Sequence, residues 1–207
     1  MPSKVIVWFV CLFAGFALVY ALFVFRKTKN NTFTLNLACD ISTLILSDSM
    51  LNNLGGLSQH SQLAFSFLGG GSDDIYRFIK NNHISCNTLV ICVGINDYRR
   101  RINSLDYISK IINEIKSHSI ILVGLFPISQ QREKIMRVSN DILKKHNKLL
   151  ISFYCQIPKI SFYDPFENGF FLEDKQNTNF FSPDGLHLNS NGLNKIRSDL
   201  IQIIGDK

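Results

Sequence analysis

The chain has 207 residues, 46% of them hydrophobic, and a formal net charge of +6. This length suits one domain of ordinary size with an additional segment. Four basic residues, Lys4, Arg26, Lys27 and Lys29, flank one apolar run, which leaves 18 basic and 16 acidic residues, a net charge of +2, in residues 31–207. A nucleic-acid-binding domain needs a basic patch on its folded part, so we expect no nucleic-acid partner.

The apolar run covers residues 5–25 and contains no charged residue. As a helix it would span about 32 Å, enough for a hydrocarbon core of about 30 Å. It is longer than the apolar part of a usual signal peptide and has no clear cleavage site before Arg26. We therefore predict a retained transmembrane anchor in residues 1–30, a linker in 31–41 and one folded domain in 42–207.

The orientation of this predicted single-pass anchor is left open by the charges. The basic residues after the run favour a cytoplasmic domain by the positive-inside rule, whereas a short amino terminus is typical of a signal anchor that exports the domain after it. We expect an extracytoplasmic domain.

After the linker, short apolar runs alternate with amphipathic stretches. The runs predict strands at 44–46, 63–68, 88–93 and 119–126, with a last strand at either 151–155 or 160–163. The amphipathic stretches predict helices at 73–80, 105–115, 129–150 and 193–204. Residues 164–181 form an aromatic-rich stretch that predicts an irregular loop. This alternation predicts a parallel sheet covered by helices on both faces.

Small or polar residues follow the first three predicted strands. Ser49, the run Gly69-Gly70-Gly71 and Asn96 each come one to three residues after a strand. Because the carboxyl ends of parallel strands meet at one edge of the sheet, we expect these residues to lie together there. Ser49 is then a candidate nucleophile, although small polar residues after a strand are more often caps or turns.

A base for this serine is found near the carboxyl terminus. Asp184 precedes His187 by three residues in a turn-rich segment before the last predicted helix. A carboxylate that accepts the Nδ1 proton leaves Nε2 free to take a proton from a hydroxyl group. Asp184-Gly185 also favours a simple turn, and both interpretations fit these residues equally well. His146, near a predicted helix end, is expected to be solvated or to face the helix dipole.

Four blocks in order resemble the SGNH hydrolases, the GDSL-like lipase/esterase family. They are Ser47-Asp48-Ser49, Gly69-Gly70-Gly71, Gly94-Ile95-Asn96-Asp97 and Asp184-Gly185-Leu186-His187. The resemblance covers about residues 42–203. It implies a three-layer α/β/α, flavodoxin-like fold with a central parallel sheet of about five strands.

The resemblance also implies the roles of the residues in an ester hydrolase. Ser49 is the nucleophile, His187 the base and Asp184 the group that orients it. The oxyanion hole is formed by the Ser49 N–H, a glycine N–H and the Asn96 amide. No metal or organic cofactor is implied, and the five cysteines lack metal-ligand spacing. The partner is an ester substrate, on a glycan or a lipid; the oligomeric state is open.

Two departures from the family pattern stand out. Ser47 replaces the first glycine of the first block, where a side chain would tighten the turn or narrow the site. Three consecutive glycines leave the oxyanion glycine ambiguous, and we choose Gly70 over Gly71 because Leu68 and Gly69 fill the preceding positions. Asp97 is expected to fix the loop by hydrogen bonds.

Two further features suit either a substrate site or ordinary structure. Arg99, Arg100 and Arg101 would face an acidic substrate or form a solvated charge run. The aromatic residues of 162–181 would line an acyl or sugar pocket or pack in the core. Besides an esterase, the same blocks would suit an acyltransferase or a catalytically silent binding protein, because fold does not fix function.

Overall fold

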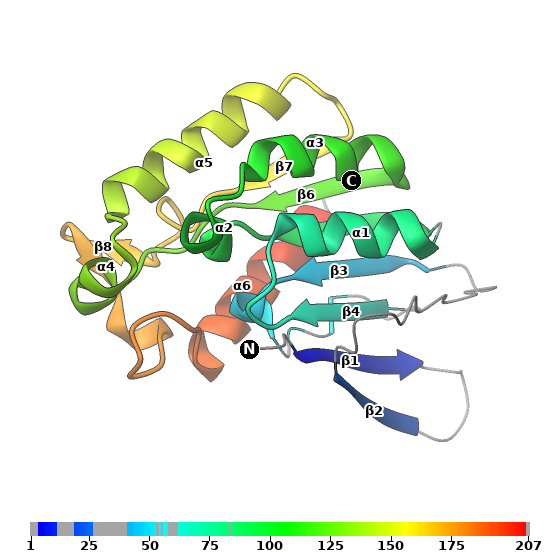
Figure 1. The fold of residues 1–207 in the computed structure, drawn as a ribbon, viewed down its shortest axis with the longest axis horizontal. Helices are drawn as coiled ribbons and strands as arrows, with labels where there is room; N and C mark the ends of the chain where they lie inside the picture. The colour runs from blue at the N-terminus through cyan, green and yellow to red at the C-terminus, as the bar shows by residue number, and fades with distance from the viewer. Residues whose placement is uncertain are drawn as a thin grey trace.

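A computed structural model describes residues 4–11, 19–26, 41–52, 54, 56–57, 62–82 and 84–205. Five parallel strands form its centre, in the order β4-β3-β5-β6-β7. Counted from the first parallel strand, this order is 2-1-3-4-5, the flavodoxin-like arrangement. The predicted α/β architecture with about five parallel strands is therefore confirmed (Figure 1).

The strands match the predicted apolar runs closely. They are β3 (Thr43–Ser47), β4 (Gln62–Phe67), β5 (Ser85–Cys92), β6 (Lys116–Val123) and β7 (Ile160–Tyr163). Alternate residues of each strand point to opposite faces, so Leu44 and Leu46 join one buried cluster and Ile45 joins the other. A strand that is buried on both faces reads as a continuous apolar run, which is why the sequence marks these strands so clearly.

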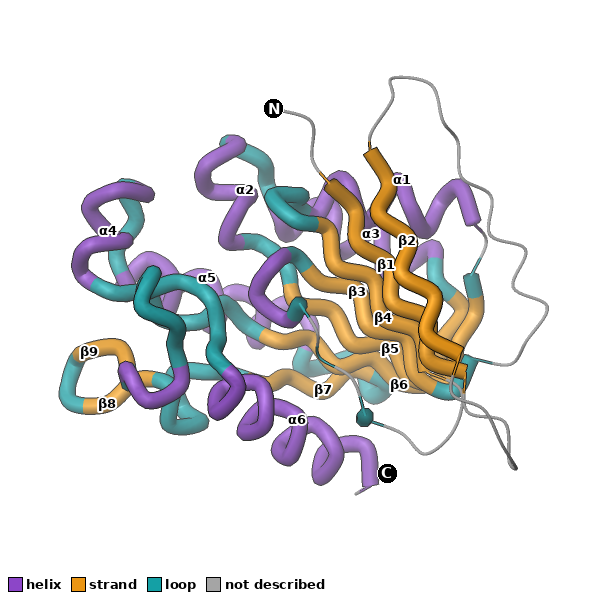
Figure 2. The backbone as a smooth tube through the Cα atoms, turned by 90° about the horizontal axis from the view of Figure 1, so that it is seen from below, coloured by secondary structure: helices purple, strands orange, loops and turns teal. Residues whose placement is uncertain are grey.

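Helices cover both faces of the sheet. The described part of the chain contains η1 (Ser49–Leu51), α1 (Ser72–Asn82), α2 (Ile95–Arg100), α3 (Ser104–Glu114), α4 (Gln130–Met136), α5 (Asn140–Tyr154), η2 (Thr178–Phe180) and α6 (Ser190–Gly205). Helices α1, α3 and α5 lie together above the sheet in Figure 1, and Figure 2 shows α6 in front of the opposite face. Both core clusters are thus enclosed by helices on one side and the sheet on the other.

The segment predicted as one helix over 129–150 is two helices. Arg137 has φ 55° and ends α4, and Ser139 begins α5 by accepting a hydrogen bond from the Ile142 N–H. Ile135, which the apolar spacing of the segment would place on a buried face, is 62% exposed. The apolar spacing continues across the break, so the pattern alone did not reveal it.

The structure also decides where the last strand lies. Residues 151–154 belong to α5, and the last parallel strand is β7. The predicted irregular loop contains a short hairpin, β8 (Phe171–Leu172) with β9 (Lys175–Gln176), followed by η2.

The predicted transmembrane helix over residues 5–25 is not supported. Lys4–Cys11 (β1) and Val19–Arg26 (β2) form antiparallel strands, and β1 pairs with β4 at the edge of the sheet. Both runs are rich in Val and Phe, with Trp8 in the first and Tyr20 in the second, and these residue types suit strands as well as apolar helices. Among the described residues, no helix has the length and apolar character to cross a membrane. The predicted linker lies outside the described residues except for Ile41, which is buried.

Candidate active site

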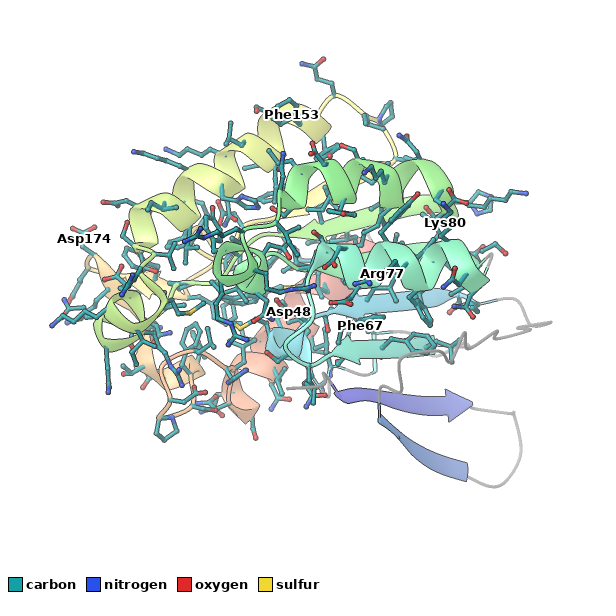
Figure 3. The ribbon with its side chains drawn as sticks, in the orientation of Figure 1. Asp48, Phe67, Arg77, Lys80, Phe153 and Asp174 are labelled. Atoms are coloured by element: carbon teal, nitrogen blue, oxygen red, sulfur yellow. The ribbon has the colours of Figure 1, made fainter. Side chains whose placement is uncertain are left out.

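Ser49 lies at the carboxyl edge of the sheet, two residues after β3 ends. It begins η1, whose N-cap is Asp48. The Asp48 carboxylate accepts a hydrogen bond from the Met50 N–H (2.9 Å), and the Asp48 N–H donates to the Cys92 carbonyl of β5 (3.0 Å). Figure 3 shows Asp48 at this end of β3. The turn that presents Ser49 is thus tied to the neighbouring strand.

The structure joins Ser49, His187 and Asp184 in a chain of hydrogen bonds. The Ser49 Oγ lies 2.9 Å from the His187 Nε2, although the two residues are 138 positions apart. The His187 Nδ1 lies 2.5 Å from the Asp184 Oδ2. A carboxylate can only accept, so we assign the ring proton to Nδ1, which leaves Nε2 free to accept the serine proton.

The other oxygen of Asp184 fixes its own loop. Its Oδ1 accepts hydrogen bonds from the N–H groups of Leu186 and His187, both at 3.0 Å. Partial burial acts to raise the pKa of Asp184, but hydrogen bonds from Leu186 and His187 hold it below its usual value. Asp184 is therefore an anion at neutral pH, as an orienting carboxylate must be.

Asn96 lies after β5, in the first turn of α2, and faces the glycine run after β4. Its Nδ2 donates a hydrogen bond to the Gly70 carbonyl (3.0 Å). Because β3, β4 and β5 are neighbouring parallel strands, the predicted meeting of Ser49, the glycines and Asn96 at one edge follows. An amide nitrogen has two hydrogens, so one remains for a ligand.

The predicted role of the Gly70 N–H is not supported, because that N–H donates to the Phe67 carbonyl (2.8 Å). The bond closes a turn in which Gly69 has φ +68°, a conformation that favours glycine. The runner-up, Gly71, donates its N–H to the Asp74 carboxylate (3.2 Å). A side chain at Gly71 would also collide with the Asp97 carboxylate. The glycine run thus shapes the loop, and its Gly70 carbonyl holds Asn96.

Ser47, at the position where the resembled family has a glycine, is accommodated inside the sheet. Its side chain is buried, and its Oγ lies 3.3 Å from the Oγ of Ser66, its partner on β4. The departure is accommodated by a second small polar residue on the adjacent strand.

Asp48 is a buried carboxyl group that is only half satisfied. It is 1% exposed, and its Oδ2 has no hydrogen-bond partner among the described residues. Burial raises the pKa of Asp48 to about 7, with a smaller contribution from Asp97 and an opposing hydrogen bond from the Met50 N–H. The pKa of Asp48 is higher in the folded chain than in the unfolded chain. Its contribution to stability is therefore largest at low pH, where the group is protonated in both states, and is lost as the pH rises through the folded pKa.

The native chain is therefore expected to lose stability as the pH rises from 4 to 8. Asp48→Asn is expected to lose less, because an asparagine side chain does not ionise. Over this interval the free energy of unfolding of the native chain should fall by about 2–4 kcal/mol more than that of the variant, since one pKa unit is worth about 1.4 kcal/mol. Urea unfolding at each pH measures the difference. Parallel pH profiles for the two proteins would show that Asp48 keeps an ordinary pKa.

The arginine run is structural in part. The Arg100 Nη1 lies 2.9 Å from Asp73 and 2.6 Å from Asp74 at the start of α1. The neighbouring Asp97, fully buried, accepts a hydrogen bond from the Ser72 N–H (3.0 Å) and so caps α1. These contacts give Asp97 the predicted structural role, and they engage the Arg100 guanidinium in ion pairs within the protein.

The aromatic loop packs mainly in the core. Phe166, Phe170 and Phe181 are at most 7% exposed and belong to the cluster beneath α6. Phe170 stacks edge-on against Phe126, with ring centroids 5.0 Å apart. Of the two predicted roles, the structure favours core packing for these three.

Three residues that the sequence did not single out support the loop that carries Asp184. Ser129 donates its N–H to the Gly185 carbonyl (3.0 Å), and Gln176, which is buried, donates to that carbonyl (3.2 Å) and to the Pro127 carbonyl (2.9 Å). Arg132 donates its Nε–H to the Asp184 carbonyl (2.6 Å). These contacts join segments that are far apart in the sequence, and no local pattern marks them.

One further histidine, His146, lies elsewhere than the sequence suggested. His146 is buried in the middle of α5, and burial lowers its pKa to about 4, so the expectation that it would be solvated or face the dipole at a helix end was wrong. No group of three metal-ligating side chains lies together in the described segments.

Comparison of the fold with solved structures identifies its type. A Streptococcus pneumonia protein described as a candidate platelet activating factor superposes with a TM-score of 0.68 at 13% identity, covering 82% of this chain and 86% of its own. A GDSL-like lipase from Bacteroides thetaiotaomicron gives 0.59 at 16% identity, with 80% and 88% covered. The chain has the SGNH hydrolase fold.

A third match is a carbohydrate acetylesterase from Sinorhizobium meliloti. It has a TM-score of 0.57 at 12% identity and covers 81% of this chain and 99% of its own. No protein-family model and no curated protein matches the chain. At these identities the likeness shows the fold alone.

Proposed function

We propose that this chain is a serine esterase that hydrolyses carboxylic esters through an acyl-Ser49 intermediate. The observation that carries the proposal is the continuous hydrogen-bonded chain from the Ser49 Oγ through the His187 imidazole to the Asp184 carboxylate. The solved esterases and lipases of the same fold support it. Nucleophile, base and orienting acid are all protein groups, so the proposed reaction needs no cofactor.

The first half of the reaction transfers the acyl group to Ser49. The Ser49 Oγ attacks the ester carbonyl carbon while its proton moves to the His187 Nε2. The negative oxygen of the tetrahedral intermediate accepts hydrogen bonds from the Ser49 N–H and from the Asn96 amide. His187 then gives its proton to the leaving alcohol oxygen, and the carbon–oxygen bond to the alcohol breaks.

The second half releases the acid. A water molecule gives a proton to the His187 Nε2 and attacks the acyl carbon. His187 then returns the proton to the Ser49 Oγ as the bond between Oγ and the acyl carbon breaks, and the carboxylic acid leaves. Asp184 stays ionised throughout and stabilises the imidazolium. The side chains of His187 and Asp184 are 38% and 32% exposed, so water or an acceptor alcohol can reach the acyl-enzyme.

We further propose that the acyl group is short and that its alcohol is a carbohydrate hydroxyl. Long acyl chains need an apolar groove, and the buried phenylalanines of residues 162–181 are already packed against the core. A carbohydrate acetylesterase among the structures of this fold is consistent with acetyl as the acyl group.

A graded ester panel tests this proposal. With the full chain and one 4-nitrophenol leaving group, kcat/KM should fall steadily from acetate through butyrate to octanoate and palmitate. Acetylated sugars should release acetate, and an added alcohol acceptor would reveal an acyltransferase by a transferred ester product. Preference for palmitate would overturn the short-acyl proposal, and no turnover of any ester together with no labelling of Ser49 would overturn the esterase proposal.

A further inference from the structure

Arg132 reaches from α4 to the loop of the proposed orienting acid, 52 residues away. Its Nε–H donates to the Asp184 backbone carbonyl (2.6 Å). Its Nη2 lies 3.6 Å from the Asp184 Oδ2, the same oxygen that accepts the His187 Nδ1 proton. The guanidinium therefore holds both ends of Asp184, the peptide by a hydrogen bond and the carboxylate by charge.

The start of α4 is itself fixed against the Asp184 loop. The Ser129 N–H donates to the Gly185 carbonyl (3.0 Å), and the Ser129 Oγ accepts from the Arg132 N–H (3.3 Å) as the N-cap of α4. Gly185 has φ +65°, and a side chain on it would collide with the Ser129 hydroxyl. Gln176 closes the contact by bridging the Gly185 and Pro127 carbonyls. Arg132 thus extends from a support whose position relative to Asp184 is set by several bonds.

We propose that Arg132 is a positioning residue that aligns the Asp184–His187 pair for catalysis. The inference rests on the proposed esterase function. At 3.6 Å the guanidinium attracts the Asp184 Oδ2 without replacing the His187 proton on it. It favours the ionised carboxylate and prevents the Asp184 peptide from turning away, so the imidazole keeps its Nε2 directed at Ser49.

The geometry requires an arginine at this position. The bond to the Asp184 carbonyl comes from Nε, in the stem of the planar fork, while the terminal nitrogen faces the carboxylate. A lysine ammonium is a point charge on a flexible chain and does not span both acceptors in this fixed geometry. An exposed ion pair that served only stability would accept either residue.

Chemical rescue tests the proposal. Arg132→Ala should lower kcat by on the order of tenfold with little change in KM, since small misplacements of catalytic groups are costly. Millimolar guanidinium chloride should restore several-fold of the lost kcat, whereas equal sodium chloride should not. Arg132→Lys should remain impaired. Lys134→Ala, at an exposed position on the same helix, is the matched control and should behave as the native chain.

The proton between His187 and Asp184 gives a readout that needs no substrate. Its downfield proton NMR signal should be present in the native chain and in Ser49→Ala, and shifted or broadened in Arg132→Ala. An unchanged signal with an unchanged kcat would overturn the proposal. A reduced kcat that guanidinium does not restore, with a lowered melting temperature, would also overturn it and assign Arg132 to stability. If the native chain turned over no ester but the signal still changed in Arg132→Ala, the esterase proposal would have failed and the positioning role of Arg132 would stand.

Discussion

Ser49→Ala is expected to lower kcat/KM for ester hydrolysis by about 10⁴-fold or more, because loss of a catalytic nucleophile leaves only binding and oxyanion stabilisation. The variant should fold normally. The Ser49 side chain is half-buried, and its hydroxyl bonds to His187 at the surface of the site. Initial rates on 4-nitrophenyl acetate measure the loss.

The control for this result is Ser152→Ala. Ser152 lies on α5, is exposed, and bonds its hydroxyl to the Leu149 carbonyl of its own helix. Its removal should leave the rate within about twofold of the native value, as is usual for surface substitutions. If Ser49→Ala kept a tenth of the native activity, the nucleophile would have to be sought elsewhere.

Asn96→Ala is expected to lower kcat by about 10²–10³-fold, as removal of one oxyanion donor does in other acyl transfers. The effect should fall on kcat more than on KM, because the amide bonds more strongly to the charged oxygen of the intermediate than to the neutral ester. Steady-state kinetics with the preferred ester separate the two parameters.

A second variant controls for the loss of an asparagine side chain outside the proposed oxyanion hole. Asn96 also bonds to the Gly70 carbonyl, so its loss loosens the loop after β4. Asn103→Ala removes an exposed asparagine whose side chain, in the described part of the chain, makes no capping bond at the start of α3, and it should leave kcat unchanged. Equal loss of kcat in Asn96→Ala and Asn103→Ala would remove Asn96 from the oxyanion hole.

The residues of the site that could be predicted from the sequence alone are those that follow the ends of parallel strands. Parallel strands buried on both faces are continuous apolar runs, so the positions of Ser49 and Asn96 at one edge followed from topology. Asp184 and His187 are three residues apart, and their pairing is a local matter. The contact between His187 and Ser49 needed the resemblance of the four blocks to a known family.

The glycine run shows why the oxyanion glycine could not be predicted. Three glycines in a row admit many conformations, and the choice among their N–H groups depends on the turn they form. Here the turn uses the Gly70 N–H for the Phe67 carbonyl and places Gly69 at positive φ. The sequence marks a flexible loop and leaves its hydrogen bonds undetermined.

The amino-terminal run shows a second limit. An apolar segment rich in β-branched and aromatic residues fits a membrane helix and a strand, and the structure pairs β1 with the edge of β4. Edge strands attract further strands because their backbone groups are unpaired. Whether a strand pairs there depends on the folded sheet. The local sequence pattern of residues 5–25 does not contain that information.

The most direct test of Ser49 as the nucleophile is the site of covalent labelling by a fluorophosphonate probe, mapped by mass spectrometry on the full chain. We predict one probe per chain on Ser49, no labelling in Ser49→Ala and greatly reduced labelling in His187→Ala. Labelling of another residue, or equal labelling of the native chain and Ser49→Ala, would contradict the assignment of Ser49 as the nucleophile.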